Sequence, residues 1–274
     1  MYKSIQVKDF NFARFPRITY QEVNDYKAKN KDKLINIQKY LMNKENILSV
    51  DRIANHLFLD VKADIFLSHS HKDEDDVIRL AILIERKLGL TVFIDSCVWG
   101  NAYELLAALD YEYCIEATGK TFDYHKRNHT TANVFMILNA ALHRIIDNCE
   151  AFIFLGTDNS ISITDAIDKE KYISSPWIYS ELQFAALVER KKPRNIAFES
   201  RDNTFADSIA KDEKPVQFAF TVPNTDATLS NQKLLEWLQN ANRPSTNSFY
   251  HPLDDLYTAM TTRKHNLSIK HEVY

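Results

Sequence analysis

The sequence predicts an α/β fold in which a flavodoxin-like parallel sheet carries helices on both faces. Short apolar runs rich in β-branched and aromatic residues alternate along the chain with segments whose apolar residues recur at helical intervals. Such alternation is typical of βαβ units, which build parallel sheets covered on both faces. With 274 residues, of which 45% are hydrophobic, the chain can bury a substantial core without disulfide bonds or structural metal ions.

Three regions are expected along the chain. Residues 1–61 are predicted to form a helical extension, because 20–43 and 48–58 carry partial apolar stripes. Residues 62–240 are predicted to form the α/β domain, and residues 241–274 a helical tail that packs on it.

The first βα unit of this domain is expected to start with a strand at 63–68, a short apolar run of the kind found in buried strands. The acidic residues at 73–76 suit the N-terminus of a helix. The apolar stripe of this helix runs from Val77 to Leu88, and Gly89 is placed to end it. A second strand is expected at 90–95.

The rest of the domain is predicted to continue this alternation around one insertion. The insertion is expected at about 117–147, as a polar loop over 117–132 followed by a helix with a very regular apolar stripe. Ser175 is predicted to cap a further helix, with Pro176 in its first turn. The other expected elements are a helix at 103–115, strands at 151–155, 195–198 and 216–222, and a helix at 230–240.

Composition excludes several functions. With only 4 glycines the chain holds no G-x-G-x-x-G motif, and Gly119-Lys120-Thr121 lacks the earlier glycine of a P-loop. The net charge of −3 provides no basic field for nucleic acid. Three cysteines without C-x-x-C spacing indicate a reducing compartment, and no apolar run reaches the roughly 18 residues of a membrane span. We therefore expect a cytoplasmic protein that binds neither nucleic acid nor a membrane.

Three loops are predicted to meet beyond the carboxyl ends of the strands, where open α/β sheets bind their ligands. They are 69–74, 96–103 and 157–175. The first contains His69, His71 and Asp73, whose spacing is close to that of the zinc ligands of metallo-β-lactamases. However, Glu74 stands where that ligand set requires a histidine, and a helix follows in place of a glycine-rich stretch. No metal site is therefore predicted.

Two acidic residues are further candidates for chemistry. Glu181 lies four residues after Trp177, on the same largely apolar face of a helix. Its carboxylate either extends to solvent at the rim of that face or has a functional role within it. Asp95 ends the second strand, with Trp99 in the loop after it. The phosphoacceptor pocket of response regulators is disfavoured, because no aspartate stands at the end of the strand 151–155.

Three segments together resemble the signature segments of the TIR (Toll/interleukin-1 receptor) domain. They are Asp64–His69, Val92–Asp95 and Ser175–Leu182, and the last contains the W-x-x-x-E spacing of Trp177 and Glu181. The segments stand in the order that the family requires, and the resemblance covers about residues 62–200. It implies a flavodoxin-like parallel sheet, and many bacterial TIR domains cleave NAD⁺.

The resemblance also implies roles for individual residues. Glu181 matches the catalytic glutamate of the family. The substrate NAD⁺ is then expected to contact the loop after the first strand, the start of the loop after the second strand, and the tryptophan before the glutamate. These residues are Ser68, His69, Ser70, His71, Asp95, Trp99 and Trp177. Because NAD⁺ is consumed as a substrate, neither a cofactor nor a metal is expected.

The chain is also similar to the stand-alone TIR subunits of Thoeris anti-phage defence systems. The segment 95–100 and the helical insertion carry this similarity. It implies that the protein makes an ADP-ribose-derived signal that a separate effector protein reads. It further implies a phage-derived trigger and self-association through the TIR loops.

The expected chemistry needs only one carboxylate. Nicotinamide leaves NAD⁺ as a neutral molecule, so a carboxylate that stabilises the oxocarbenium-like transition state is sufficient. The exclusion of water from the site decides whether the product is ADP-ribose, a cyclic isomer or an adduct. Two alternatives remain. One is a non-catalytic TIR scaffold that recruits partners through 96–103, and the other is an enzyme like the nucleoside deoxyribosyltransferases, which also use a glutamate at an N-glycosidic bond.

Overall fold

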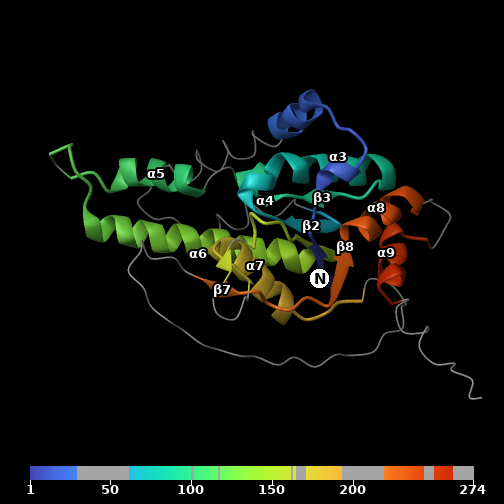
Figure 1. The fold of residues 1–274 in the computed structure, drawn as a ribbon. Helices are drawn as coiled ribbons and strands as arrows, with labels where there is room; N and C mark the ends of the chain where they lie inside the picture. Colours follow the sequence, from blue (N-terminus) through green and yellow to red (C-terminus); the bar gives the residue numbers. More distant parts are fainter. Residues whose placement is uncertain are drawn as a thin grey trace, which may run out of the picture.

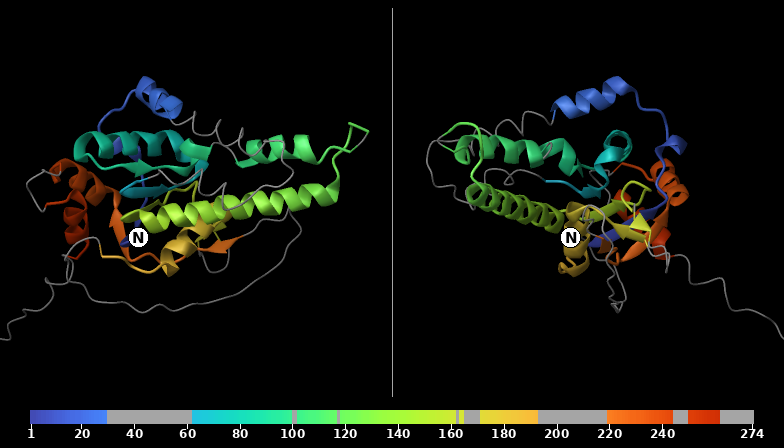
Figure 2. Two further views of the ribbon diagram at one scale, coloured as in Figure 1. Left: turned by 180° about the vertical axis from the view of Figure 1, so that it is seen from behind. Right: turned by 60° about the vertical axis from the view of Figure 1, so that its left-hand side comes forward.

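A five-stranded parallel sheet forms the centre of the computed structural model (Figure 1). Helices cover both of its faces (Figure 2). This confirms the predicted α/β class, and the order of β3, β2 and β4 is consistent with a flavodoxin-like sheet. The structure describes residues 1–29, 62–99, 102–116, 118–161, 163–164, 171–192, 219–243 and 250–261. In spatial order the strands are β3 (Val92–Phe93), β2 (Ile65–Ser68), β4 (Ala151–Leu155), β1 (Lys3–Lys8) and β8 (Ala227–Ser230).

The strand β1 lies inside the sheet, between β4 and β8. Its Ile5 pairs in register with Ile153 on one side and with Ala227 on the other. The prediction of a helical extension over 1–61 is therefore wrong for Lys3–Lys8. This strand was missed because only two apolar residues alternate between lysines, and its burial comes from neighbours that are distant in sequence. Residues 20–29 are helical as predicted, and 30–61 lie outside the described residues.

One face of the sheet packs against α3 (Glu74–Leu88), α8 (Asn231–Asn240) and α9 (Pro252–Thr261). Alternate strand residues supply the contacts, because successive side chains of a strand point to opposite faces. Gly89 ends α3 with a left-handed backbone, at φ 67°, and its N–H bonds to the carbonyl of Glu85, as expected of the predicted cap. The buried strand residues on this face are Ile5, Val7, Ile65, Leu67, Ala151, Ile153, Leu155 and Leu229.

The other face packs against α5 (Ala102–Tyr113), α6 (Tyr124–Asn148) and α7 (Pro176–Leu187) through Phe66 and its neighbours on β4. The predicted polar loop over 117–132 is wrong from residue 124 onward, because α6 begins there. Asp123 caps the helix by accepting a hydrogen bond from the Lys126 N–H at 3.0 Å. The first turns of α6 are rich in polar residues and are exposed. They run beside α5 beyond the edge of the sheet (Figure 1).

A small antiparallel sheet of β5 (Ile163–Thr164), β6 (Lys171–Ile173) and β7 (Phe220–Thr221) lies apart from the central one. The strand predicted at 216–222 was expected in the parallel sheet, but its residues 220–221 pair with β6 instead. The strand β8 occupies the outer place beside β1. The strand predicted at 195–198 lies outside the described residues. Among the described helices, none has the length and hydropathy needed to cross a membrane.

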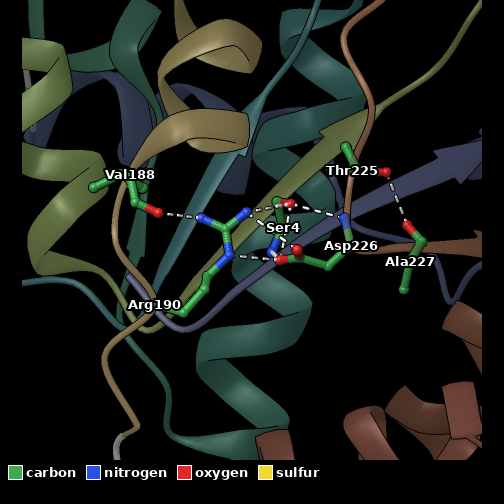
Figure 3. A network of polar contacts seen from close by, with 6 residues as sticks. All are labelled: Ser4, Val188, Arg190, Thr225, Asp226 and Ala227. Carbon is green, nitrogen blue, oxygen red and sulfur yellow. Dashed lines mark hydrogen bonds and ion pairs between the residues drawn. The ribbon is translucent and has the colours of Figure 1, made fainter. Parts of the chain in front are cut away.

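A polar network at the amino ends of the strands holds β1 in place (Figure 3). Asp226, just before β8, accepts hydrogen bonds from the N–H and the hydroxyl of Ser4 at 2.8 and 3.0 Å. Arg190, which follows α7, donates to both carboxylate oxygens of Asp226, at 3.0 and 3.1 Å. The fork-like pairing of guanidinium and carboxylate fixes direction as well as distance. The network therefore ties two segments that are distant in sequence, the residues after α7 and those before β8, to the start of β1.

We predict that Asp226→Ala destabilises the fold by about 2 kcal/mol, because it leaves the fully buried Ser4 and the guanidinium of Arg190 without their acceptor. In a chain of this size the loss lowers Tm by about 4–8 °C. Thermal unfolding measures the effect. The control is Glu236→Ala, which removes an exposed hydrogen bond within α8 and changes stability by about 0.5 kcal/mol or less. Equal Tm values for the two variants would contradict the role of the network.

Candidate functional site

The strand β2 and the helix α7 bring two polar side chains together inside the protein. Along β2, Phe66 and Ser68 share the face that packs against α7. The helix begins as predicted, since Ser175 caps it and Pro176 occupies its first turn. This start places Glu181 in the second turn, where its Oε2 accepts a hydrogen bond from the Ser68 hydroxyl at 2.6 Å. Sheet and helix are thus joined at the carboxyl end of a parallel strand.

Glu181 is the most deeply buried acidic residue of this region. It is 2% exposed, although it is a charged residue type that proteins bury only with a partner. Burial raises the pKa of Glu181 well above its usual range, and the nearby negative charge of Asp95 raises it further. The hydrogen bond from Ser68 lowers the pKa but does not outweigh these effects. The carboxyl group therefore holds a proton to a higher pH than an ordinary glutamate.

A second pair of polar residues lies beside Glu181, between β2 and β3. The imidazole of His69, whose side chain is 1% exposed, has its Nδ1 3.7 Å from Oδ1 of Asp95. Its Nε2 lies 3.2 Å from the hydroxyl of Ser96. Asp95 begins a short helix, α4 (Asp95–Trp99), so the predicted loop over 96–103 is wrong for its first residues. The strands β2 and β3 end side by side because they pair in parallel, and this brings His69 and Asp95 together.

The loops after β2 and β4 are held together by Asp73. Its carboxylate accepts hydrogen bonds from the Thr157 hydroxyl and from the Asn159 amide, both at 2.5 Å. Ser70 is buried at the start of this loop, whereas His71 is exposed at its rim. The two loops are therefore adjacent, as expected from the parallel sheet.

The zinc-like spacing of His69, His71 and Asp73 does not become a cluster in the structure. His69 turns toward Ser96, while Asp73 bonds to the loop after β4. Over the described part of the chain, no group of three or more histidine, cysteine or acidic side chains is arranged to hold a metal ion.

The two tryptophans of the predicted site have different positions. The ring of Trp177 is half-buried and stacks on Phe135 of α6, with 4.9 Å between the ring centroids. It lies one turn before Glu181 in α7, so packing between α6 and α7 fixes its ring. Trp99 ends α4, and its side chain lies outside the described residues.

Ser96 and Glu74 belong to this site and were not predicted. Ser96 is buried between His69 and Glu74, and it forms side-chain hydrogen bonds to both. The only sequence signal was the position of Ser96 directly after Asp95. Glu74 was predicted as an acidic residue at a helix N-terminus and as a departure from a zinc ligand set, but its link to Ser96 was missed because its partners come from distant segments.

No family model, no curated protein and no solved structure matches the chain. An α/β fold by itself hosts many unrelated functions. The chemistry of the site around Ser68 and Glu181 is therefore the basis for a functional proposal.

We predict that Glu181→Gln gains stability over the wild type as the pH rises. The folded protein keeps a proton on Glu181 that the unfolded chain releases above the ordinary pKa of 4.5. The stability that this proton provides is complete below pH 4.5 and is lost as the pH rises through the raised pKa of the folded state. Glutamine is nearly isosteric, accepts the Ser68 hydrogen bond and does not titrate.

Thermal unfolding over a pH series measures the difference in Tm between Glu181→Gln and the wild type. The exposed Glu189, just after α7, provides the matched control. Glu189→Gln is expected to differ from the wild type by the same amount throughout the series. A constant difference for Glu181→Gln as well would contradict a buried, protonated carboxyl group.

Proposed function

We propose that the chain is a TIR-type NAD⁺ glycohydrolase or ADP-ribosyl cyclase, with Glu181 as its catalytic carboxylate. One observation carries this proposal: a buried glutamate meets the carboxyl end of a parallel strand, in the W-x-x-x-E context of α7. Open α/β sheets bind their ligands at this edge. An acidic residue with a shifted pKa at this edge of the sheet is a candidate catalytic residue. The resemblance of the segments around Ser68, Asp95 and Glu181 to TIR signature segments supports the same assignment.

The substrate brings a positive charge to Glu181. NAD⁺ carries a pyridinium cation next to the bond that breaks. A cation beside Glu181 favours the ionised carboxylate, so substrate binding releases the proton that burial retains. In a site closed to water the resulting ion pair is strong, because the local dielectric constant is low.

The chemical step then breaks one bond. The bond between C1′ of the ribose and the pyridinium nitrogen cleaves, and its electron pair stays with the nitrogen, so nicotinamide leaves as a neutral molecule. Positive charge develops on the ribose ring, and the carboxylate of Glu181 stabilises it. Water attacks C1′ to give ADP-ribose, or a nucleophile such as the adenine attacks to give a cyclic product. The proton of the attacking group passes to solvent.

Several of the other predicted substrate contacts lie close to this carboxylate. Ser68 holds Glu181 through its hydrogen bond, and the pair of His69 and Asp95 lies beside it. In our proposal the exposed His71 at the rim and the ring of Trp177 face the nucleotide. Ser70 and Trp99 complete the proposed set of substrate contacts.

The proposal extends to signalling in the cytoplasm. An ADP-ribose-derived product would act as a messenger in anti-phage immunity and would be read by a separate effector. A phage-derived trigger and self-association through the loops at the carboxyl edge of the sheet would control its synthesis. The resemblance to Thoeris TIR subunits is the support for this part.

We predict that Glu181→Gln folds normally and lowers nicotinamide release from NAD⁺ by about 10²-fold or more, because it removes the main stabilising charge of the transition state. Chromatography with mass spectrometry resolves nicotinamide, ADP-ribose and cyclic products. Glu189→Gln, which changes an exposed carboxylate just after α7, is expected to retain wild-type turnover. Substantial cleavage by a folded Glu181→Gln variant would overturn the assignment of Glu181.

A further inference from the structure

The helices α6 and α7 pack against each other (Figure 1) through two matched rows of side chains. Residues spaced three or four apart share one face of a helix. One such row on α6 pairs with one such row on α7, and all six side chains are half-buried. We call the paired rows the α6–α7 ladder, which consists of Phe135, Asn139 and His143 on α6 and Trp177, Ser180 and Phe184 on α7.

Stacked rings form both ends of the α6–α7 ladder. The rings of Phe135 and Trp177 stack with 4.9 Å between their centroids. At the other end, the rings of His143 and Phe184 stack with 4.3 Å between their centroids, and their planes differ by 4°. Aromatic pairs have preferred distances and orientations. The two stacks therefore limit how far α7 slides along α6.

Ser180 lies between the two stacks and bonds to the polar residues of the α6 row. Its hydroxyl donates a hydrogen bond to Oδ1 of Asn139 at 2.9 Å. A hydroxyl has a single proton, so toward His143 the Ser180 oxygen accepts, and the donor is Nε2 of the imidazole, 3.0 Å away. Two residues one turn apart on α6 therefore fix the direction of one hydroxyl on α7.

Glu181 lies on the neighbouring face of α7, which packs toward the sheet. The apolar residues of this face, Ile178, Leu182 and Ala185, are buried in the same core cluster as Phe66 of β2. Successive residues are about 100° apart around a helix, so one rotation of α7 moves the side chains of positions 180 and 181 together. Apolar packing is non-directional, whereas hydrogen bonds weaken steeply when they are misaligned. The ladder therefore restricts this rotation more tightly than the apolar face does.

We propose that Asn139 and His143 are positioning residues. They hold Ser180 and thereby set the rotation of α7 that brings Glu181 to Ser68. Oε2 of Glu181 lies 2.6 Å from the Ser68 hydroxyl, and a hydrogen bond of this length tolerates little displacement. Misplacement of a catalytic group by about 1 Å can lower a rate by about 10²-fold. The kinetic part of this inference rests on the proposed function, in which Glu181 is the catalytic carboxylate, whereas the structural part does not.

Three variants separate this role from general stability. Ser180→Ala removes both hydrogen bonds of the ladder and leaves the two ring stacks in place. Alanine has the highest helix propensity, so α7 still forms. Ser180→Thr keeps the hydroxyl and is expected to behave as the wild type. Asp226→Ala is the matched control, because it also removes hydrogen bonds between distant segments, but at the amino ends of the strands.

The first test is independent of catalysis and measures the Tm difference that Glu181→Gln makes in each background over a pH series. In the wild type this difference changes with pH, because burial raises the pKa of Glu181. In Ser180→Ala the helix can rotate and water reaches the carboxyl group, so its pKa falls toward the usual range and the change with pH becomes smaller. The full change is expected in Ser180→Thr and Asp226→Ala. His143 is present in both members of each pair, so its own titration cancels. A constant difference in the wild type, or an undiminished change in Ser180→Ala, would overturn the inference.

The second test separates kcat from KM for NAD⁺, at a temperature below the Tm of every variant. Ser180→Ala is expected to lower kcat by about 10- to 100-fold and to change KM by about twofold or less, because a misplaced carboxylate weakens binding of the transition state. Asn139→Leu and His143→Phe each remove one hydrogen bond and are expected to lose less. Ser180→Thr and Asp226→Ala are expected to retain kcat. Equal losses in Ser180→Ala and Asp226→Ala, or no loss in either, would contradict the positioning role.

The two tests also separate this inference from the proposed function. Absence of NAD⁺ cleavage in the wild type would contradict the proposed function, and the pH series would still decide whether the ladder sets the position of Glu181.

Discussion

The hydrogen bond between Ser68 and Glu181 joins the central sheet to the α5–α7 layer at a point closed to solvent. A carboxylate in such a place is costly, and a single hydroxyl donor compensates only part of the lost hydration. Burial therefore favours the protonated form of Glu181. A positively charged ligand stabilises the ionised carboxylate and so displaces the proton. The buried acid therefore favours a cationic substrate over a neutral one. The proposed chemistry on NAD⁺ agrees with this preference.

The parallel alignment of the strands determines which residues can meet at this point. The carboxyl ends of β2 and β3 lie side by side. Ser68 and His69, at the end of β2, therefore meet Asp95, which follows β3, at one edge of the sheet. The central position of β1 has a further effect. It makes the N-terminal region part of the same fold, and the helical residues 20–29 then contact the start of α3 through Lys27. The N-terminal segment is thus a structural component of the site.

The elements that depend on local pattern could be predicted from the sequence. The buried strand at 151–155, the glycine cap at Gly89 and the serine cap at Ser175 follow from residue type and spacing, and the structure confirms them. The elements that depend on distant partners could not. The strand β1 gains its burial from both neighbours in the sheet, and Ser96 gains its place from Glu74 and His69. A buried Glu181 was only one of two possibilities, because a helical face does not reveal what covers it.

Calorimetric measurement of proton exchange tests the central claim most directly. The ligand is an NAD⁺ analogue in which a methylene replaces the ring oxygen of the nicotinamide ribose, so it binds without cleavage. Titrations in buffers of different ionisation enthalpy report the protons released on binding. The account predicts proton release with the cationic analogue and none with its neutral, reduced form, and no release for Glu181→Gln. Binding of the cationic analogue without proton release, or no binding at all, would contradict it.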